Sequence, residues 1–121
     1  MGRTRELGLA GESQAAAFLT RRGYRLLARN ARADGVELDL VVERAGVVIF
    51  VEVKTRRSRW LGGPELAVDA RKQARLARGA AAWLRVHRPR ARRARFDVIA
   101  CEPEPEGSWR ITHIESAFDA G

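Results

Sequence analysis

Val36-Glu37-Leu38-Asp39-Leu40-Val41-Val42-Glu43 and Val47-Val48-Ile49-Phe50-Val51-Glu52-Val53-Lys54 are the two stretches that decide the fold of this chain. Both runs are rich in β-branched and aliphatic residues, which favour strands. Between them lies Ala45-Gly46, which predicts a tight two-residue turn. The sequence therefore predicts an antiparallel hairpin, and its register follows from the turn.

This register would bring four charged side chains to one face of the hairpin. A two-residue turn places Asp39 opposite Glu52 and Glu37 opposite Lys54. A four-residue loop would pair Glu37 with Glu52 and keep all four on one face, whereas an odd loop length would separate them. Opposed carboxylates repel each other unless a cation or a proton joins them. Oxygen ligands without His or Cys suit Mg²⁺ or Mn²⁺.

The other face of the hairpin is predicted to be apolar core. Strand periodicity puts the following residues there: Leu38, Leu40, Val42, Val47, Ile49, Val51 and Val53. The charged face continues towards the turn with Val41, Val48 and Phe50, so it is not a simple solvated surface. We therefore expect apolar packing on both faces of the hairpin.

The rest of the chain predicts one α/β domain over residues 1–121. Helical spacing of apolar residues predicts helices over 7–22, stopped by Gly23, and from Asp69, a candidate N-cap, to Val86. Further strands are predicted over 24–30, 96–101 and 109–114. The order is α-β-β-β-α-β-β, an α/β sandwich around a central mixed sheet.

Composition excludes several classes of protein. The longest run without a charged residue is Ser13 to Thr20, eight residues, whereas a membrane helix needs about 20. The first residues contain no apolar core of a signal peptide. A single cysteine, Cys101, excludes an internal disulfide and a cysteine zinc cluster. We expect a cytoplasmic protein that makes no contact with a membrane.

The charge distribution indicates a polyanionic partner. The net charge is +8, the pI is about 11.2, and residues 56–95 hold 13 Lys and Arg against 2 Asp and Glu. Nucleic acid is the favoured partner. Residues 34–55, in contrast, are net acidic. A protein that only binds phosphate has little use for these carboxylates, whereas a metal-dependent nuclease needs them. Only Lys54 and Lys72 are lysines among the 23 cationic residues, which singles them out.

Asp39, followed after 12 residues by Glu52-Val53-Lys54, resembles the D…ExK motif of the PD-(D/E)XK, or restriction-endonuclease-like, superfamily. The predicted order of elements is similar to the core of that superfamily. More narrowly, the chain resembles the YraN-like family of small bacterial proteins over roughly residues 8–100. The matching segments are Gly11-Glu12, Glu37-Leu38-Asp39-Leu40, Phe50-Val51-Glu52-Val53-Lys54-Thr55-Arg56, Lys72 and Arg95-Phe96-Asp97-Val98.

The resemblance implies roles for individual residues. Asp39, Glu52 and the carbonyl of Val53 would bind Mg²⁺ or Mn²⁺, and Lys54 would orient or activate the attacking water. Glu12, like the first-helix glutamate of archaeal-type Holliday-junction resolvases, could reach the same metal. With Lys54 and Glu12, we count Glu37 as a catalytic candidate.

Cationic and aromatic residues nearby are candidates for nucleic-acid contact. Arg56, Arg57 and Arg59, together with the basic stretch 85–95, would bind backbone phosphates, and Trp60 could stack on a base. Lys72 could contact phosphate or the active site. The alternatives are that Trp60 anchors a loop and that Glu12 and Lys72 are helix-surface charges. Trp83 and Cys101 are predicted core residues.

Three hypotheses on function follow. The first is a metal-dependent endonuclease that acts on DNA rather than RNA, including branched or repair intermediates. The second is a non-catalytic nucleic-acid-binding protein that keeps the nuclease fold. The third is a basic protein that binds RNA or ribosomes, in which the acidic hairpin is only structural. Whether the protein forms a homodimer is left open, since a junction-cutting enzyme would benefit from two symmetric sites.

Overall fold

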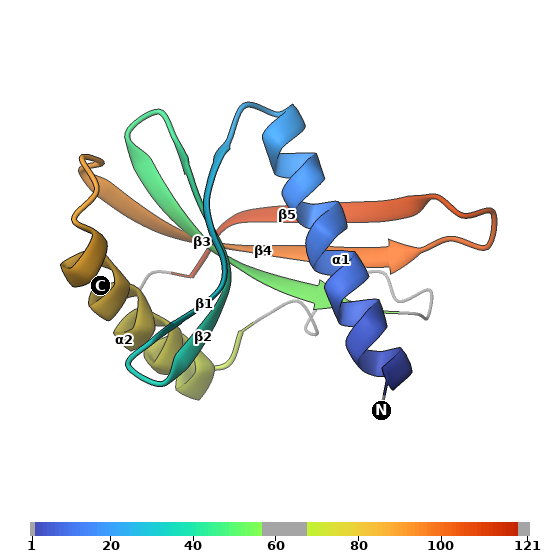
Figure 1. Cartoon of the computed structure of the whole chain (residues 1–121), viewed down its shortest axis with the longest axis horizontal. Helices are drawn as coiled ribbons and strands as arrows, with labels where there is room; N and C mark the ends of the chain where they lie inside the picture. The colour runs from blue at the N-terminus through green and yellow to red at the C-terminus, as the bar shows by residue number, and fades with distance from the viewer. Residues whose placement is uncertain (1, 57–67, 119–121) are drawn as a thin grey trace.

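The computed structural model describes residues 2–56 and 68–118. Its elements follow the predicted order α-β-β-β-α-β-β (Figure 1). They are α1 (Gly2–Arg21), β1 (Arg25–Ala33), β2 (Val36–Arg44), β3 (Val47–Thr55), α2 (Ala70–His87), β4 (Arg93–Pro103) and β5 (Trp109–Phe118). The predicted fold class is confirmed, although the strands are longer than predicted.

The five strands form one mixed sheet in the order β1-β2-β3-β4-β5. Neighbouring strands are antiparallel except β3 and β4, which are parallel and are joined across a face of the sheet through α2. Helix α1 packs on one face and α2 on the other (Figure 1). This three-layer arrangement is consistent with a restriction-endonuclease-like fold.

Local sequence signals predict where α1 ends and where α2 begins. Gly23, with φ +90°, follows α1, and the N–H groups of Gly23 and Tyr24 donate to the carbonyls of Thr20 and Leu19. This is the Schellman pattern, for which glycine is the favoured residue. Asp69 is the N-cap of α2, and its carboxylate accepts a hydrogen bond from Lys72 N at 2.8 Å.

The predicted hairpin register is confirmed where β2 and β3 are paired, but the predicted pairs of Asp39 with Glu52 and of Glu37 with Lys54 do not form. Ala45 and Gly46 have φ values of 54° and 77°, so they form the two-residue turn between β2 and β3. The paired residues run from Arg44 opposite Val47 to Leu40 opposite Val51.

Beyond that last pair, β2 and β3 diverge. There β2 stays paired with β1, and β3 stays paired with β4 (Figure 1). The prediction that Leu38 shares a face with Leu40 and Val42 is wrong. Leu38 packs with Val36 under α2, while Leu40 and Val42 pack under α1, because β2 twists at Asp39 where it leaves β3.

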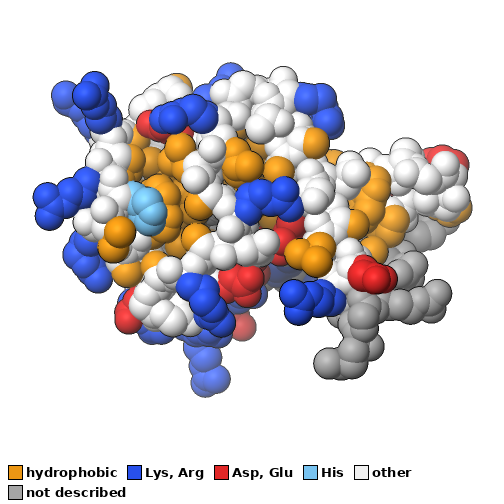
Figure 2. All heavy atoms as spheres, viewed as in Figure 1, with side chains coloured by type: hydrophobic (Ala, Val, Ile, Leu, Met, Phe, Trp, Pro, Cys, Tyr) orange, Lys and Arg blue, Asp and Glu red, His pale blue; other side chains and the backbone are white. Residues whose placement is uncertain are grey.

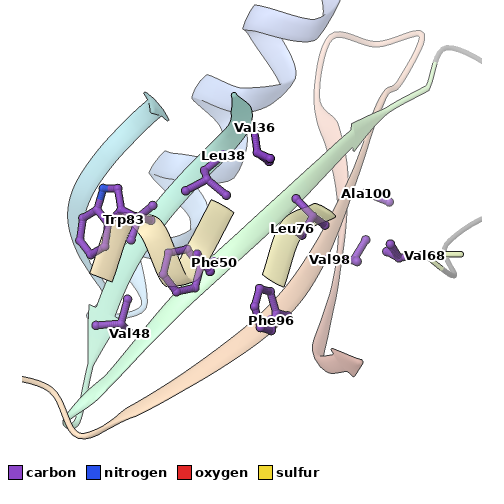
Figure 3. Packing of buried hydrophobic residues seen from close by; sticks show 12 residues of the cluster. Val36, Leu38, Val48, Phe50, Val68, Leu76, Trp83, Phe96, Val98 and Ala100 are labelled. Carbon is purple, nitrogen blue, oxygen red and sulfur yellow. The ribbon is translucent and has the colours of Figure 1, made fainter. Parts of the chain in front are cut away.

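Apolar clusters lie on both faces of the sheet, as expected. On the α2 face, the ring of Phe50 packs between those of Trp83 and Phe96 (Figure 3). Trp83, 4% exposed, is a core residue as predicted. Gly79 allows α2 to cross close to the sheet, since a Cβ there would lie 2.8 Å from Val36 Cβ. On the α1 face Cys101 is fully buried, also as predicted.

Candidate active site

A pocket of about 190 Å³ lies between α2 and the region where β2 and β3 diverge. Its lining residues are Val36, Glu37, Asp39, Glu52, Lys72, Arg75 and Leu76. Three predicted site carboxylates therefore lie in one pocket, and Lys72 joins them there. The divergence of the strands creates this space, because paired strands would leave no room for a ligand between their side chains.

Asp39 is the most perturbed acid of the pocket. Its Oδ2 accepts a hydrogen bond from the backbone N–H of Val53 at 2.9 Å. Burial, followed by the nearby charge of Glu52, raises the pKa of Asp39 to about 7, and Glu12 and Glu37 add to the rise. The bond from Val53 opposes this effect but does not cancel it. Asp39 thus gains a proton or a cation at little cost near neutral pH.

Glu52 is held by a lysine from α2. Lys72 Nζ lies 2.5 Å from Glu52 Oε2, and the Glu52 side chain is only 10% exposed. The Asp69 cap fixes the first turn of α2, which carries Lys72. The structure therefore places Lys72 on a candidate metal ligand rather than on an isolated helix surface.

Lys54 lies two residues beyond Glu52 on β3 and is partly buried. Burial lowers the pKa of Lys54, the charge of Glu52 opposes this shift, and Lys72 reinforces it. Its ammonium group therefore lies within electrostatic range of both the pocket acid and the pocket lysine.

Glu12 approaches from α1, on the other face of the sheet. Gly11 makes this approach possible, because a Cβ there would lie 2.0 Å from Thr55 Oγ1. Oε1 of Glu12 is buried and has no hydrogen-bond partner among the residues that the structure describes. The negative charge of Glu12 also helps to raise the pKa of Asp39, so the two carboxylates repel each other across the sheet.

These oxygen donors suit a hard divalent cation. Within residues 2–56 and 68–118, no group of three or more His, Cys, Asp and Glu side chains is arranged to hold a metal ion. Mg²⁺, however, commonly uses one or two carboxylates and keeps several waters. Asp39 and Glu52 can supply those two carboxylates, and the buried, unpaired Oε1 of Glu12 is a further acceptor in need of a partner.

The residues predicted to bind nucleic acid are only partly described. Arg56 continues from β3, and its backbone N–H donates to the carbonyl of Cys101 at 2.9 Å. Arg57, Arg59 and Trp60 lie outside the described residues. The basic stretch 85–95, which begins in the last turn of α2, is exposed at Arg85, Arg88, Arg90, Arg92 and Arg93. Figure 2 shows Lys and Arg side chains spread over the visible face, several of them at the end of the molecule where α2 ends.

Sequence reasoning missed Arg75, which also lines the pocket. A signal for it exists, because Arg75 follows Lys72 by three residues and so lies on the same face of α2.

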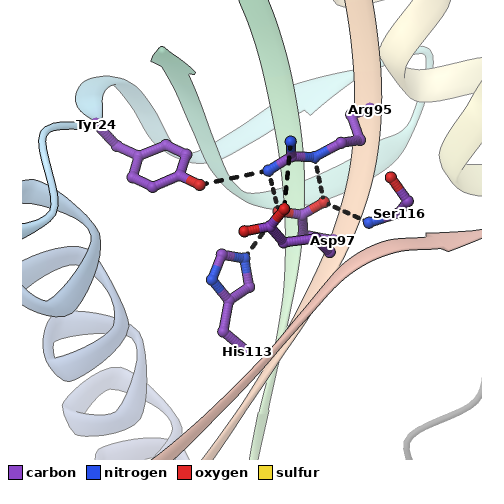
Figure 4. Close-up of polar contacts among 6 residues, drawn as sticks. Tyr24, Arg95, Asp97, His113 and Ser116 are labelled. Atoms are coloured by element: carbon purple, nitrogen blue, oxygen red, sulfur yellow. Dashed lines mark hydrogen bonds and ion pairs between the residues drawn. The ribbon is translucent and has the colours of Figure 1, made fainter. Parts of the chain in front are cut away.

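A buried polar network around Asp97 was also missed (Figure 4). The Asp97 side chain is fully buried and accepts hydrogen bonds from Arg95 Nε and Nη2 and from His113 Nε2, each at 2.8 Å. The N–H of Ser116 adds a fourth bond at 3.0 Å. Burial alone would raise the pKa of Asp97, but the bonds from His113, Arg95 and Ser116 hold it below its usual value. Arg95 and Asp97 are neighbours on one face of β4, but only the pairing of β4 with β5 brings His113 and Ser116 to them, so no local signal could reveal the network.

No helix in the described part of the chain has the length and apolar character that a membrane span requires.

The sequence matches the profile of the uncharacterised protein family UPF0102 over residues 11–101. It is 49% identical over 117 residues to a UPF0102 protein of Symbiobacterium thermophilum, covering 97% of this chain and 99% of that protein. A UPF0102 protein of Trichlorobacter lovleyi is 47% identical over 114 residues, with 93% and 90% of the two chains covered. One of Geobacter sulfurreducens is 44% identical over 113 residues, with 93% and 88% covered.

Proposed function

The chain belongs to the uncharacterised protein family UPF0102, and from the chemistry of its pocket we propose that it is a metal-dependent endonuclease of the PD-(D/E)XK superfamily. Its reaction would be hydrolysis of phosphodiester bonds in DNA, including branched or repair intermediates. The observation that carries this proposal is Asp39, a partly buried carboxylate beside Glu52 whose pKa is raised to about 7. A catalytic site is where such a perturbed group is most often found.

Asp39, Glu52 and the carbonyl of Val53 would hold Mg²⁺ or Mn²⁺. A divalent cation, when bound, supplies Lewis-acid chemistry by lowering the pKa of water and screening the phosphate charge. The N–H of Val53 already orients Asp39, which reduces the freedom that this carboxylate loses on binding. Glu12, with its unpaired buried oxygen, would bind a water or the cation from the α1 side.

Cationic side chains at the pocket would act on the phosphate. Lys54 would donate to the oxygens that gain charge as the phosphorus becomes pentacoordinate. Lys72 and Arg75 line the pocket and would hold non-reacting phosphate oxygens. Glu37, exposed at the rim, would accept a proton from the water. Each role uses a side chain that faces the pocket or lies within electrostatic range of it.

The remaining charge supports nucleic acid as the substrate. The net charge of +8 persists although the pocket itself is rich in carboxylates. Arg56, Arg57 and Arg59 beyond β3, with Trp60 and the arginines after α2, would bind the backbone without reading sequence. A cytoplasmic protein with this surface meets DNA and RNA, and we propose DNA.

Metal binding and cleavage test the proposal together. Calorimetry with Mn²⁺ should show binding to the wild type and none to Asp39→Ala or Glu52→Ala. The control is Glu106→Ala, which removes an exposed acid from the turn between β4 and β5 that does not line the pocket. A panel of single-stranded, duplex, flapped and four-way DNA with Mg²⁺ should then show cleavage by the wild type and control only. Equal metal affinity in all four proteins would overturn the proposal.

One observation favours a second candidate, a nucleic-acid-binding protein without activity. The ion pair with Lys72 neutralises Glu52, a candidate metal ligand, by a side chain of the protein itself. In that case the wild type would bind duplex DNA, bind no Mn²⁺, and cleave nothing in the panel.

A further inference from the structure

A second pocket, of about 510 Å³, lies where the C-terminal end of α1 meets β5. Three cationic side chains line it, Arg21 and Arg22 from the end of α1 and Arg44 from the end of β2. None of the three forms an ion pair or a side-chain hydrogen bond with the described part of the chain. Their N–H donors are therefore available to an acceptor from outside.

Aromatic rings hold two of these guanidinium groups in place. Arg22 Cζ lies 4.2 Å from the centroid of the Phe18 ring, and Arg44 Cζ lies 5.2 Å from that of Tyr24. A guanidinium stacked on a ring keeps its in-plane N–H groups directed outward. Each guanidinium thus lies over the ring face on which a nucleobase would otherwise stack at this pocket.

The buried Asp97 network supports the rings from beneath (Figure 4). His113, which donates to Asp97, contacts Phe18 and Tyr24 edge to face, with centroids 6.0 and 6.2 Å apart. Arg95, also bonded to Asp97, donates to the Tyr24 hydroxyl at 3.4 Å. The floor of the pocket is thus rigid before any ligand arrives, which reduces the entropy lost on binding.

The charges around the pocket favour an anion. Its acidic residue, Glu115, is 58% exposed and faces Arg95 Nη1 at 3.7 Å. Asp97 beneath it is already bonded to Arg95 and His113. The three arginines therefore leave the pocket net positive, and their planar donors match the oxygens of a phosphate group.

We propose that the pocket formed by Arg21, Arg22 and Arg44 binds a backbone phosphate of the nucleic-acid strand, as a second contact apart from the metal site. This inference rests on the proposed action on nucleic acid. A strand is favoured over a free nucleotide, because guanidinium groups already lie over the Phe18 and Tyr24 rings, on which a base could otherwise stack here.

Salt-dependent DNA binding tests this assignment. Fluorescence anisotropy of a duplex, in EDTA so that no cleavage occurs, gives the slope of log K against log[salt]. Arg22→Gln/Arg44→Gln should flatten the slope by about one unit, since each phosphate contact contributes about 0.9. Arg22→Lys/Arg44→Lys should keep the wild-type slope. Arg32→Gln/Arg110→Gln, which removes two exposed arginines elsewhere, should change it by less than about half a unit.

Other results would overturn the phosphate assignment, the proposed function or both. An unchanged slope in the glutamine pair, or an equal change in the control pair, would overturn the proposal. A rise in the melting temperature of the wild type alone with inorganic phosphate or a mononucleotide, without a change in slope, would overturn the assignment to a strand. A wild type that binds no duplex would refute both this inference and the proposed function. Loss of metal binding or cleavage would refute only the proposed function, because the anisotropy assay uses neither.

Discussion

Replacing Asp39 with asparagine is expected to stabilise the metal-free protein above neutral pH. The wild-type carboxylate must ionise in a partly buried pocket beside Glu52, and the variant has no charge to bury there. The amide oxygen of the variant can still accept the hydrogen bond from Val53 N–H. The substitution therefore removes the unfavourable charge and keeps the geometry.

The size and sign of the effect follow from the pKa of Asp39. It rises from 3.8 to about 7 on folding, and each pH unit corresponds to about 1.4 kcal/mol, so the upper limit is about 4 kcal/mol. Between these pH values the folded state binds a proton that the unfolded state has lost, so wild-type stability falls as pH rises. We expect the variant to be more stable by about 2–4 kcal/mol at about pH 8. The difference should vanish below pH 3.8, where both states are protonated.

Urea denaturation of both proteins between about pH 3.5 and pH 8, in EDTA, measures this difference. Acids remote from the pocket titrate alike in the two proteins and cancel, whereas Glu52, Glu12 and Glu37 interact with Asp39 and contribute to the difference. Mg²⁺ should then stabilise only the wild type at about pH 8, because ligand binding to the folded state adds to its stability. A constant difference across the pH range would refute the reasoning, since it would mean that Asp39 ionises as easily in the folded state as in the unfolded chain.

Three further outcomes are expected. Gly11→Ala should lower the free energy of unfolding by about 1–3 kcal/mol in urea, because its Cβ would lie 2.0 Å from Thr55 Oγ1, and Thr55→Gly should recover most of this loss. Asp97→Asn should cost about 3–5 kcal/mol at neutral pH by leaving its guanidinium partner without a carboxylate. Since the pKa of Asp97 is lowered on folding, this cost should shrink as denaturation is repeated at more acidic pH. Lys54→Arg should reduce the rate of DNA cleavage by about 10²–10³-fold with little change in duplex affinity. The matched reverse exchange, Arg56→Lys, should cleave at the wild-type rate. Cleavage by Lys54→Arg at the wild-type rate would contradict a catalytic role for the lysine.

Much of the fold could be predicted because its signals are local. The turn at Ala45-Gly46 sets the hairpin register within a few residues, and that register is confirmed from Arg44–Val47 to Leu40–Val51. Asp69 caps α2 through a bond to a residue three positions away. The candidate site shares this advantage, since Asp39 and Glu52 lie on adjacent strands of one hairpin.

Side-chain placement beyond the hairpin required the tertiary structure. Strict alternation placed Leu38 beside Leu40, but β2 twists where it leaves β3, and the two leucines pack under different helices. The ion pair between Lys72 and Glu52 depends on where α2 crosses the sheet.

By itself, the sequence determined the elements, the hairpin register and the residue types of the candidate site, because short-range backbone preferences govern these features. Only the tertiary structure decided that Glu12 approaches Asp39 from the opposite layer and that Arg95 and His113 converge on the buried Asp97. Apart from the bond between Arg95 and Asp97 on one strand, these contacts join residues far apart in the chain, and their positions depend on how the helices pack and on how the strands twist, diverge and pair. Desolvation, which raises the pKa of Asp39 to about 7, likewise exists only once the layers have packed around it.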